Sequence, residues 1–194
     1  MTRRQKNAAA TRDALLASAR RRFLQESYEN VGLREIAGDV GVDVALVSRY
    51  FGSKEALFRE VLRGARGDWL DAEVPPQALP AWLAELASRA DGAGDAEDIE
   101  RLLMILRSAS SPKAARIVRD SFREDVLDPV AQLIEGDEAE VRATLALSLL
   151  IGTTISRTIM RVDAICACDK TTMRDRLEGM LAAALSETKG GVTA

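Results

Sequence analysis

The stretch LREIAGDVGVDVALVSRYFGSKE, residues 33–55, contains the signals for two short helices, a glycine turn and the start of a third helix. Gly41 can take the positive φ that ends the first helix, and Asp43 is a strong N-cap for the second. Gly52 interrupts that second helix, and Ser53 can cap the next one. Two short helices joined in this way are typical of a helix-turn-helix, which places its second helix in the major groove of DNA.

The same signals predict where these helices lie. The first is expected to start near Leu33, the second to run from Val44 to Tyr50, and the third to start at Lys54. Gly32 is a permissive N-cap for the first of them. Short helix pairs with a glycine turn also occur as ordinary helical hairpins without a role in DNA binding, and this alternative stays open on the motif alone.

The charge of the chain is divided unevenly. Residues 1–66 contain 13 Lys and Arg against 8 Asp and Glu, whereas residues 67–194 contain 14 against 22. Neutralisation of phosphates supplies the sequence-independent part of DNA affinity. A basic N-terminal part on an acidic remainder therefore suits a DNA-binding module attached to a body that avoids DNA.

These residues resemble the TetR family of bacterial transcriptional regulators, and the resemblance extends from about residue 11 to residue 61. It begins with an amphipathic first helix and Tyr28, and it ends with the run FGSKEAL at residues 51–57. The other residues that carry it are Leu15, Leu16, Ala19, Phe23, Arg34, Glu35, Ile36, Ala37, Gly41 and Val42. Residues beyond 61 resemble the ligand-binding and dimerisation domain of that family in length and helical patterning.

The resemblance implies contacts of the second helix with DNA phosphates, with two departures from the family pattern. Leu46 and Ser48 stand where the family usually has threonine and tyrosine, and Ser48 can supply only the hydroxyl at shorter reach. Tyr50 stands where histidine is frequent and keeps an aromatic ring with a hydrogen-bonding tip. Lys54 matches the lysine with which the family binds a phosphate, at a helix N-terminus.

Four side chains are candidates for reading bases. Val44 and Ala45 can contact thymine methyl groups but cannot hydrogen-bond to a base. Arg34 and Arg49 are the nearby groups that can fork onto guanine, and we hypothesise that one of them does. The alternative for Arg49 is a solvated or phosphate-bound charge, because most protein–DNA hydrogen bonds go to the backbone.

Composition and patterning predict an all-α protein. The chain has 194 residues, is 47% hydrophobic and 29% charged, and shows no alternation long enough for a strand. The apolar stretch 143–155 is shorter than a bilayer requires, and the N-terminus lacks the apolar segment of a signal peptide. These features predict a cytoplasmic protein with no membrane partner.

Two domains are expected. Residues 1–53 form the helix-turn-helix domain with a short basic arm, and residues 54–194 form a helical ligand-binding and dimerisation domain. Residues 54–70 are the connecting helix, which ends before Pro75 and Pro76. Later helices are expected near 80–90, 96–109, 113–135, 137–162 and 171–187, and Pro129 is expected to kink or divide the third of these.

Two of these helices carry apolar stripes that need a partner. The stripes are explained either by a buried place at the centre of the domain or by pairing with their copies across a two-fold axis. The family resemblance implies a four-helix dimer interface of the second kind. The candidate dimer residues are Val141, Leu145, Leu149, Gly152, Ile155, Ile159, Leu177 and Leu181.

Large apolar side chains of the second domain are candidates for the walls of a ligand pocket, since the family commonly holds an inducer there. They are Trp69, Trp82, Leu103, Met104, Leu106 and Phe122, and each can equally be part of the core. Arg107, Arg119 and Arg123 nearby would permit an anionic ligand. A ligand would act by favouring a dimer whose two DNA-binding parts are wrongly spaced.

Catalysis and cofactors are disfavoured. The chain has no histidine, so a Ser-His-Asp or Cys-His arrangement and a histidine metal site are excluded. Cys166 and Cys168 are one residue apart, a spacing that fits neither the usual zinc motif nor a redox CxxC motif, and two reduced thiols are expected. We therefore predict no enzyme activity, no metal and no cofactor.

The sequence predicts a dimeric, sequence-specific regulator of transcription that binds double-stranded DNA at a palindromic operator. We expect a repressor that a small-molecule inducer releases. The alternative is a protein that binds small molecules or helical partners and has weak or lost specific DNA binding, which the departures at Leu46 and Ser48 make conceivable.

Overall fold

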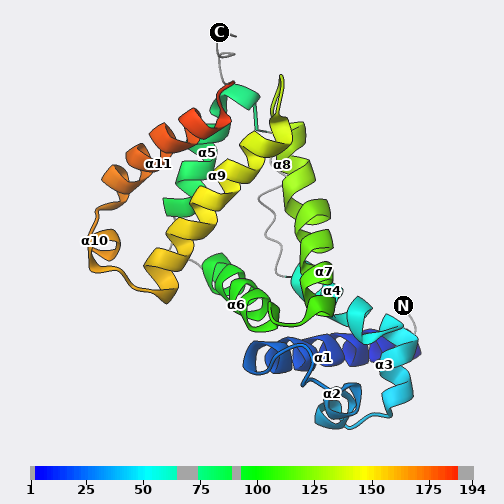
Figure 1. The fold of residues 1–194 in the computed structure, drawn as a ribbon. Coiled ribbons are helices and arrows are strands. Elements are labelled where there is room, and N and C mark those ends of the chain that lie inside the picture. The colour runs from blue at the N-terminus through cyan, green and yellow to red at the C-terminus, as the bar shows by residue number, and fades with distance from the viewer. Residues whose placement is uncertain (1–2, 65–73, 89–92, 188–194) are drawn as a thin grey trace. The chain divides into compact units, whose positions relative to one another are not determined.

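The computed structural model describes residues 3–64, 74–88 and 93–187, and every regular element in these ranges is helical, as predicted. Figure 1 shows the helices in order along the chain. They are α1 (Arg3–Gln25), α2 (Leu33–Val40), α3 (Val44–Phe51), α4 (Lys54–Gly64), α5 (Leu79–Ser88), α6 (Ala93–Ser108), α7 (Pro112–Phe122), α8 (Asp128–Gln132), α9 (Ala139–Thr154), α10 (Asp163–Cys166) and α11 (Lys170–Leu185). Three short non-α elements join them: the 3₁₀ turn η2 (Pro76–Ala78) and the π-helices η3 (Arg123–Leu127) and η4 (Ile155–Ile159).

The chain forms two compact units. Unit 1 comprises residues 1–66 and 100–122, and unit 2 comprises residues 67–99 and 123–194. This division differs from the predicted domains 1–53 and 54–194, because a segment distant in sequence packs with the N-terminal helices. The predicted connecting helix is α4 as far as Gly64, and the remainder to residue 70 lies outside the described residues.

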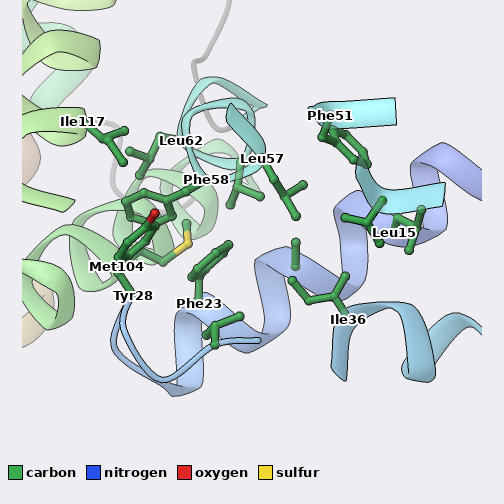
Figure 2. Close-up of a cluster of buried hydrophobic side chains, with 14 of the residues drawn as sticks. Leu15, Phe23, Tyr28, Ile36, Phe51, Leu57, Phe58, Leu62, Met104 and Ile117 are labelled. Atoms are coloured by element: carbon green, nitrogen blue, oxygen red, sulfur yellow. The ribbon is translucent and has the colours of Figure 1, made fainter. Parts of the chain in front are cut away.

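Unit 1 is built around α1, which packs against α2, α3 and α4, while α4 packs against α7. Its core contains apolar side chains from all of these helices and from the second half of α6. Phe23, Tyr28 and Phe58 lie together with Met104 of α6, as Figure 2 shows. The ring centroid of Phe58 is 4.7 Å from that of Phe23 and 5.1 Å from that of Tyr28, so three aromatic rings fix the helices around one centre.

In unit 2, α11 packs against α5 and α9, and α8 packs against α9. Its core contains Leu79 and Leu83 of α5 and four side chains of α11. Those four are Met173, Leu177, Leu181 and Leu185, spaced by four residues along one face of the helix. This core is smaller than that of unit 1 and consists mainly of leucine.

The expected break near Pro129 takes the form of a π-helix. Residues Pro112–Gln132 are helical throughout, but the turn Arg123–Leu127 is widened. Pro129 has no N–H to donate to the carbonyl of Asp125, four residues earlier, and that carbonyl lies inside the widened turn. The π-helix buries three successive side chains, Asp125, Val126 and Leu127.

The most apolar helix runs without interruption from α9 into η4. By length and composition alone this segment, Ala139–Ile159, could cross a membrane, with 21 residues and a mean hydropathy of 1.2. The sequence predicted an apolar stretch over residues 143–155, which is too short to cross a bilayer. That length was wrong, because the helix continues on both sides of these residues. About a fifth of its most apolar window, 22%, is buried inside the chain. A single helix of this kind fits an apolar face that meets other protein as well as it fits lipid.

Candidate nucleic-acid interface

The helix-turn-helix has the capping interactions that its sequence predicts. The Gly32 N–H donates to Glu35 Oε2 at 3.0 Å, and α2 ends at Gly41 with φ of 72°. The Ala45 N–H donates to Asp43 Oδ1 at 2.7 Å and so caps α3. Both ends of the turn are thus fixed by hydrogen bonds and one left-handed glycine, which sets the direction of α3.

One face of the motif is buried and the opposite face is open. Ile36 and Ala37 of α2 and Val47 and Phe51 of α3 lie in the core of unit 1. The predicted DNA-contacting side chains lie elsewhere on the two helices. Arg34, Ala45, Ser48 and Arg49 are exposed, whereas Val44 and Tyr50 are half-buried and pack against the core.

The two candidate base-reading arginines keep their guanidinium groups free. Neither Arg34 nor Arg49 has a hydrogen bond or ion pair with another described residue, although carboxylates are frequent on the neighbouring helices. Both side chains can therefore approach a base or a phosphate without first breaking a polar contact with another described residue. The hydroxyl tip of Tyr50 likewise has no hydrogen bond among the described residues, and its ring lies 6.4 Å from that of Phe51.

Lys54 has partners within the chain. Its Nζ lies 4.5 Å from the centroid of the Tyr28 ring and donates to the Glu29 carbonyl at 3.3 Å. Burial lowers the pKa of Lys54, while the charges of Glu29 and Glu55 act in the opposite direction. The lysine is therefore held at the start of α4, beside the N-cap Ser53 whose Oγ accepts from the Ala56 N–H at 3.1 Å.

Ion pairs fasten α1 to the motif. Arg22 donates from Nε and Nη2 to the two carboxylate oxygens of Asp39 at 2.7 Å each, and Ser18 Oγ donates to Asp39 at 2.6 Å. These donors hold the pKa of Asp39 well below its usual range. Arg12 pairs with Glu60 and lies 5.0 Å from the centroid of the Phe51 ring. Such contacts keep the recognition helix in one position relative to α1.

Residues 100–122 contact α1, the segment before α2, and α4, which the sequence did not predict. Arg20 Nε donates to Glu100 at 2.8 Å, Ser111 donates to Glu29, and Lys113 pairs with Glu55. Two more polar contacts join Arg107 to the Gln25 carbonyl and Arg59 to Asp120. No local pattern could have found these pairs, because the partners are far apart in the sequence.

The six candidate ligand-binding residues do not form one described site. Met104 is fully buried in the core of unit 1, beside Tyr28, and Leu106 is 49% exposed. Leu103 and Phe122 are half-buried, and Trp82 packs against the core of unit 2. Trp69 lies outside the described residues. The two residues Met104 and Trp82 thus belong to different units.

The candidate dimer residues divide into two groups. Val141, Leu145 and Gly152 of α9 are exposed, and Leu149, Ile155 and Ile159 are half-buried. Leu177 and Leu181 fill the core of unit 2, with 3% and 0% exposure, and are not accessible to a second chain. Gly179 and Met180 of the same helix are exposed.

Metal-ligating groups are scattered in the part of the chain that the structure describes, where no three Cys, Asp or Glu side chains come together as a metal site. Cys166 is exposed and Cys168 is half-buried, and both are free thiols.

Comparison with known proteins places this geometry in a family. Residues 15–61 match the family model for bacterial regulatory proteins of the tetR family. Residues 72–185 match the model for a tetracyclin repressor-like C-terminal domain. No curated protein matches the chain in sequence.

Solved structures share the fold over nearly the whole chain. NalD, the secondary repressor of the MexAB-OprM multidrug efflux pump in Pseudomonas aeruginosa, is 19% identical with a TM-score of 0.68, over 93% of this chain and 98% of that one. The multidrug binding protein EbrR, solved with ethidium, is 20% identical with a TM-score of 0.61, over 88% and 97%. SmeT, solved with triclosan, is 18% identical with a TM-score of 0.60, over 95% of each chain.

Proposed function

The chain belongs to the TetR family of bacterial regulatory proteins, and from this premise we propose that it is a homodimer that binds a palindromic operator and represses transcription until a small molecule releases it. Members of this family are DNA-binding regulators and not enzymes. The repressor's place of action is the cytoplasm, where bacterial DNA lies. The observation that carries the proposal is the open face of the helix-turn-helix, where Arg34 and Arg49 are exposed and free of partners among the described residues.

Each exposed group of this face has a role in the proposal. Arg34 or Arg49 donates to a guanine in the major groove, and Ala45 contacts a thymine methyl group. Val44 lies at the edge of the same contact, since it is half-buried. The hydroxyls of Ser48 and Tyr50 contact phosphates from α3, and the Lys54 ammonium does so from the N-terminus of α4.

Two copies of this face must be related by a two-fold axis to read a palindrome. An exposed apolar surface on unit 2 supports a contact between two such chains. Val141 and Leu145 of α9 are more than half exposed, and Ile151 and Met180 are exposed as well. Large apolar side chains grouped on neighbouring helices are unusual on a monomer. We assign the contact between chains to α9 and α11, with Gly152 and Gly179 allowing close approach of the helices.

Small-molecule release is supported by what the relatives bind. EbrR was solved with ethidium and SmeT with triclosan, and both compounds contain aromatic rings. For this chain we place the ligand in unit 2, where Trp82 is the described aromatic side chain that is only half-buried. Titration of these two compounds, followed by tryptophan fluorescence, tests the assignment; a bound compound that left the affinity for DNA unchanged would contradict release.

The experiment that tests DNA recognition is a selection from a random pool with the full chain at near-physiological salt. We expect one enriched sequence with two-fold symmetry. Arg34→Ala or Arg49→Ala is expected to change the preferred base at one position per half-site, at a cost of about 1–3 kcal/mol. Lys54→Ala is the control, because loss of a phosphate contact weakens all sequences alike.

Two results would contradict the proposal. If neither arginine variant changes the preferred sequence, base reading by these residues is wrong. If the folded dimer enriches no sequence at all, the chain is a small-molecule-binding or helical interaction protein with lost DNA specificity. The within-chain contacts of Lys54 and the departures at Leu46 and Ser48 are the observations that favour this second function.

A further inference from the structure

The beginning of α7 lies against the beginning of α4 within unit 1. Lys113, in the first turn of α7, forms an ion pair with Glu55, in the first turn of α4. Two residues earlier, the buried Ser111 donates a hydrogen bond to Glu29, which precedes α2. The Ser111 hydroxyl also accepts from the Ala114 N–H at 3.1 Å, so one side chain caps α7 and fastens it to the motif.

These contacts add a second ammonium group to the carboxylates around Lys54. The charges that act on Lys54 there are the carboxylates of Glu29, Glu55 and, more weakly, Glu35, and the ammonium group of Lys113. The Lys113 ammonium is the main cause that lowers the pKa of Glu55 to about 2, and hydrogen bonds from its own backbone and from Ser53 add to it. Glu55 is therefore charged at neutral pH, and Lys113 is its ion-pair partner.

Under the proposed function, this group lies where the protein contacts the phosphates. Lys54 is the proposed phosphate ligand, and Glu55 is the next residue of the same helix turn. An unbalanced carboxylate at this place would repel a phosphate chain, because the interaction of near-surface charges reaches about one Debye length. Lys113 of α7 supplies the positive charge that offsets Glu55. The sequence predicted α7 in the second domain and not with the N-terminal helices.

We propose that Lys113 compensates the charge of Glu55 at the DNA-binding end of α4, so that DNA is bound with full affinity only while the start of α7 is docked on the start of α4. This inference rests on the proposed function and names a way to regulate it. An effector that loosens the start of α7 lowers DNA affinity by exposing a negative charge beside the phosphates. No change in the spacing of the two DNA-binding parts is needed for this effect.

The alternative to compensation is a mechanical brace, in which the ion pair matters only because it holds two helices together. The two accounts differ in sign. Under compensation, Lys113→Gln weakens DNA binding and Glu55→Gln strengthens it, since the first variant removes a positive charge and the second a negative one. Under the brace, both variants break the same pair and both weaken binding.

The experiment measures the affinity of the full chain and its variants for a random-sequence duplex at low salt, and for the selected operator. We expect Lys113→Gln to weaken binding about threefold, the size of an exposed ion pair, and Glu55→Gln to strengthen it by a similar factor. The affinity of the double variant for DNA is expected to be close to that of the unmodified chain. Lys113→Arg keeps the positive charge and is expected to leave the affinity unchanged. All effects are expected to shrink as salt is raised.

Arg119→Gln is the matched control. Arg119 is an exposed residue of the same helix without a partner among the described residues, and it is six residues further from the docked end. Its removal takes away the same charge at a distance of about 9 Å along the helix, and a smaller loss is expected. A loss equal to that of Lys113→Gln would overturn the inference, since total charge alone would then explain it.

The random-sequence duplex separates this inference from the proposed function. Attraction to phosphates does not depend on the DNA sequence. The direction in which each variant changes the affinity can therefore be measured even if no operator is enriched. Weaker binding by Glu55→Gln, or no effect of Lys113→Gln while the chain stays folded, would overturn the inference and leave sequence-specific binding untouched. A chain that binds neither duplex would contradict both.

Discussion

Unit 1 and unit 2 differ in how completely each buries its own apolar surface. In unit 1 a large core is closed by aromatic side chains, and ion pairs surround it. Among the large apolar side chains exposed in the described part of the chain, Leu106 is the one that belongs to unit 1. The others lie in unit 2: Val141, Leu145, Ile151, Met160, Val162 and Met180. Unit 1 therefore covers most of its described apolar surface by itself, whereas the exposed apolar side chains of unit 2 are the ones that the proposed dimer would cover.

The largest test of this difference is a charge on the exposed face of unit 2. Leu145→Glu would place an unpaired carboxylate in the contact twice, once per chain, and we expect the dimer Kd to rise at least about a hundredfold. Sedimentation at micromolar concentration measures it. Leu106→Glu is the control, because this leucine is 49% exposed against 53% for Leu145 but lies in unit 1. A dimer that survives Leu145→Glu would move the contact away from α9.

The next test asks whether α6 really completes the core of unit 1. Met104→Ala removes a fully buried side chain beside Tyr28 and is expected to lower the free energy of unfolding by about 2–5 kcal/mol. Denaturant unfolding measures the loss. Leu106→Ala, two residues away and exposed, is expected to stay within about 0.5 kcal/mol. Equal effects of the two variants would mean that residues 100–122 are not part of that core.

Acid is expected to weaken unit 1 through its paired carboxylates. The pKa of Glu55 is about 2 in the folded chain, below its ordinary value of 4.5. Its contribution is therefore present above pH 4.5 and is lost as the pH falls toward 2, and solvent screening keeps it below about 1 kcal/mol. Asp39 acts in the same direction. Glu55→Gln should flatten this part of the stability–pH curve, and an unchanged curve would contradict the ion pair with Lys113.

The smallest test concerns the one polar atom in the aromatic centre of unit 1. The Tyr28 hydroxyl is buried without a hydrogen-bond partner among the described residues, and burial raises the pKa of Tyr28 to about 12. Tyr28→Phe is therefore expected to leave the free energy of unfolding unchanged or to raise it by up to about 1 kcal/mol.

The alkaline branch of the curve gives the control for this variant. Because the folded pKa of Tyr28 lies above its ordinary value of 10, the chain loses stability as the pH rises from 10 to 12, and Tyr28→Phe removes that loss. A clear destabilisation by Tyr28→Phe at neutral pH would show that the hydroxyl has a bonded partner, such as a buried water molecule.

Local signals in the sequence were sufficient for the elements of unit 1. Glycines and caps set the ends of α2 and α3. The three helices α2, α3 and α4 begin where the sequence predicted, at Leu33, Val44 and Lys54. These boundaries depend on neighbours within four residues, which the sequence contains directly.

Contacts between distant segments could not be predicted in the same way. Nothing near Met104 or Lys113 indicates that they pack with the N-terminal helices, because the choice of partner is made by the fold. Leu177 and Leu181 share their apolar character with Met180, so periodicity alone did not tell which side of α11 faces the core. The sequence predicted a break near Pro129 but not its form. The widened turn buries Asp125, and this burial cannot be read from the proline alone.

The central claim is that unit 1 binds DNA and that unit 2 joins two chains, so that the dimer presents two copies of unit 1 to the DNA. The mass of the complex between the full chain and the selected duplex tests it most directly, in one measurement. We predict two chains per duplex, with protection of two symmetric half-sites about one or more helical turns apart. One chain on one unsymmetrical site would contradict the claim.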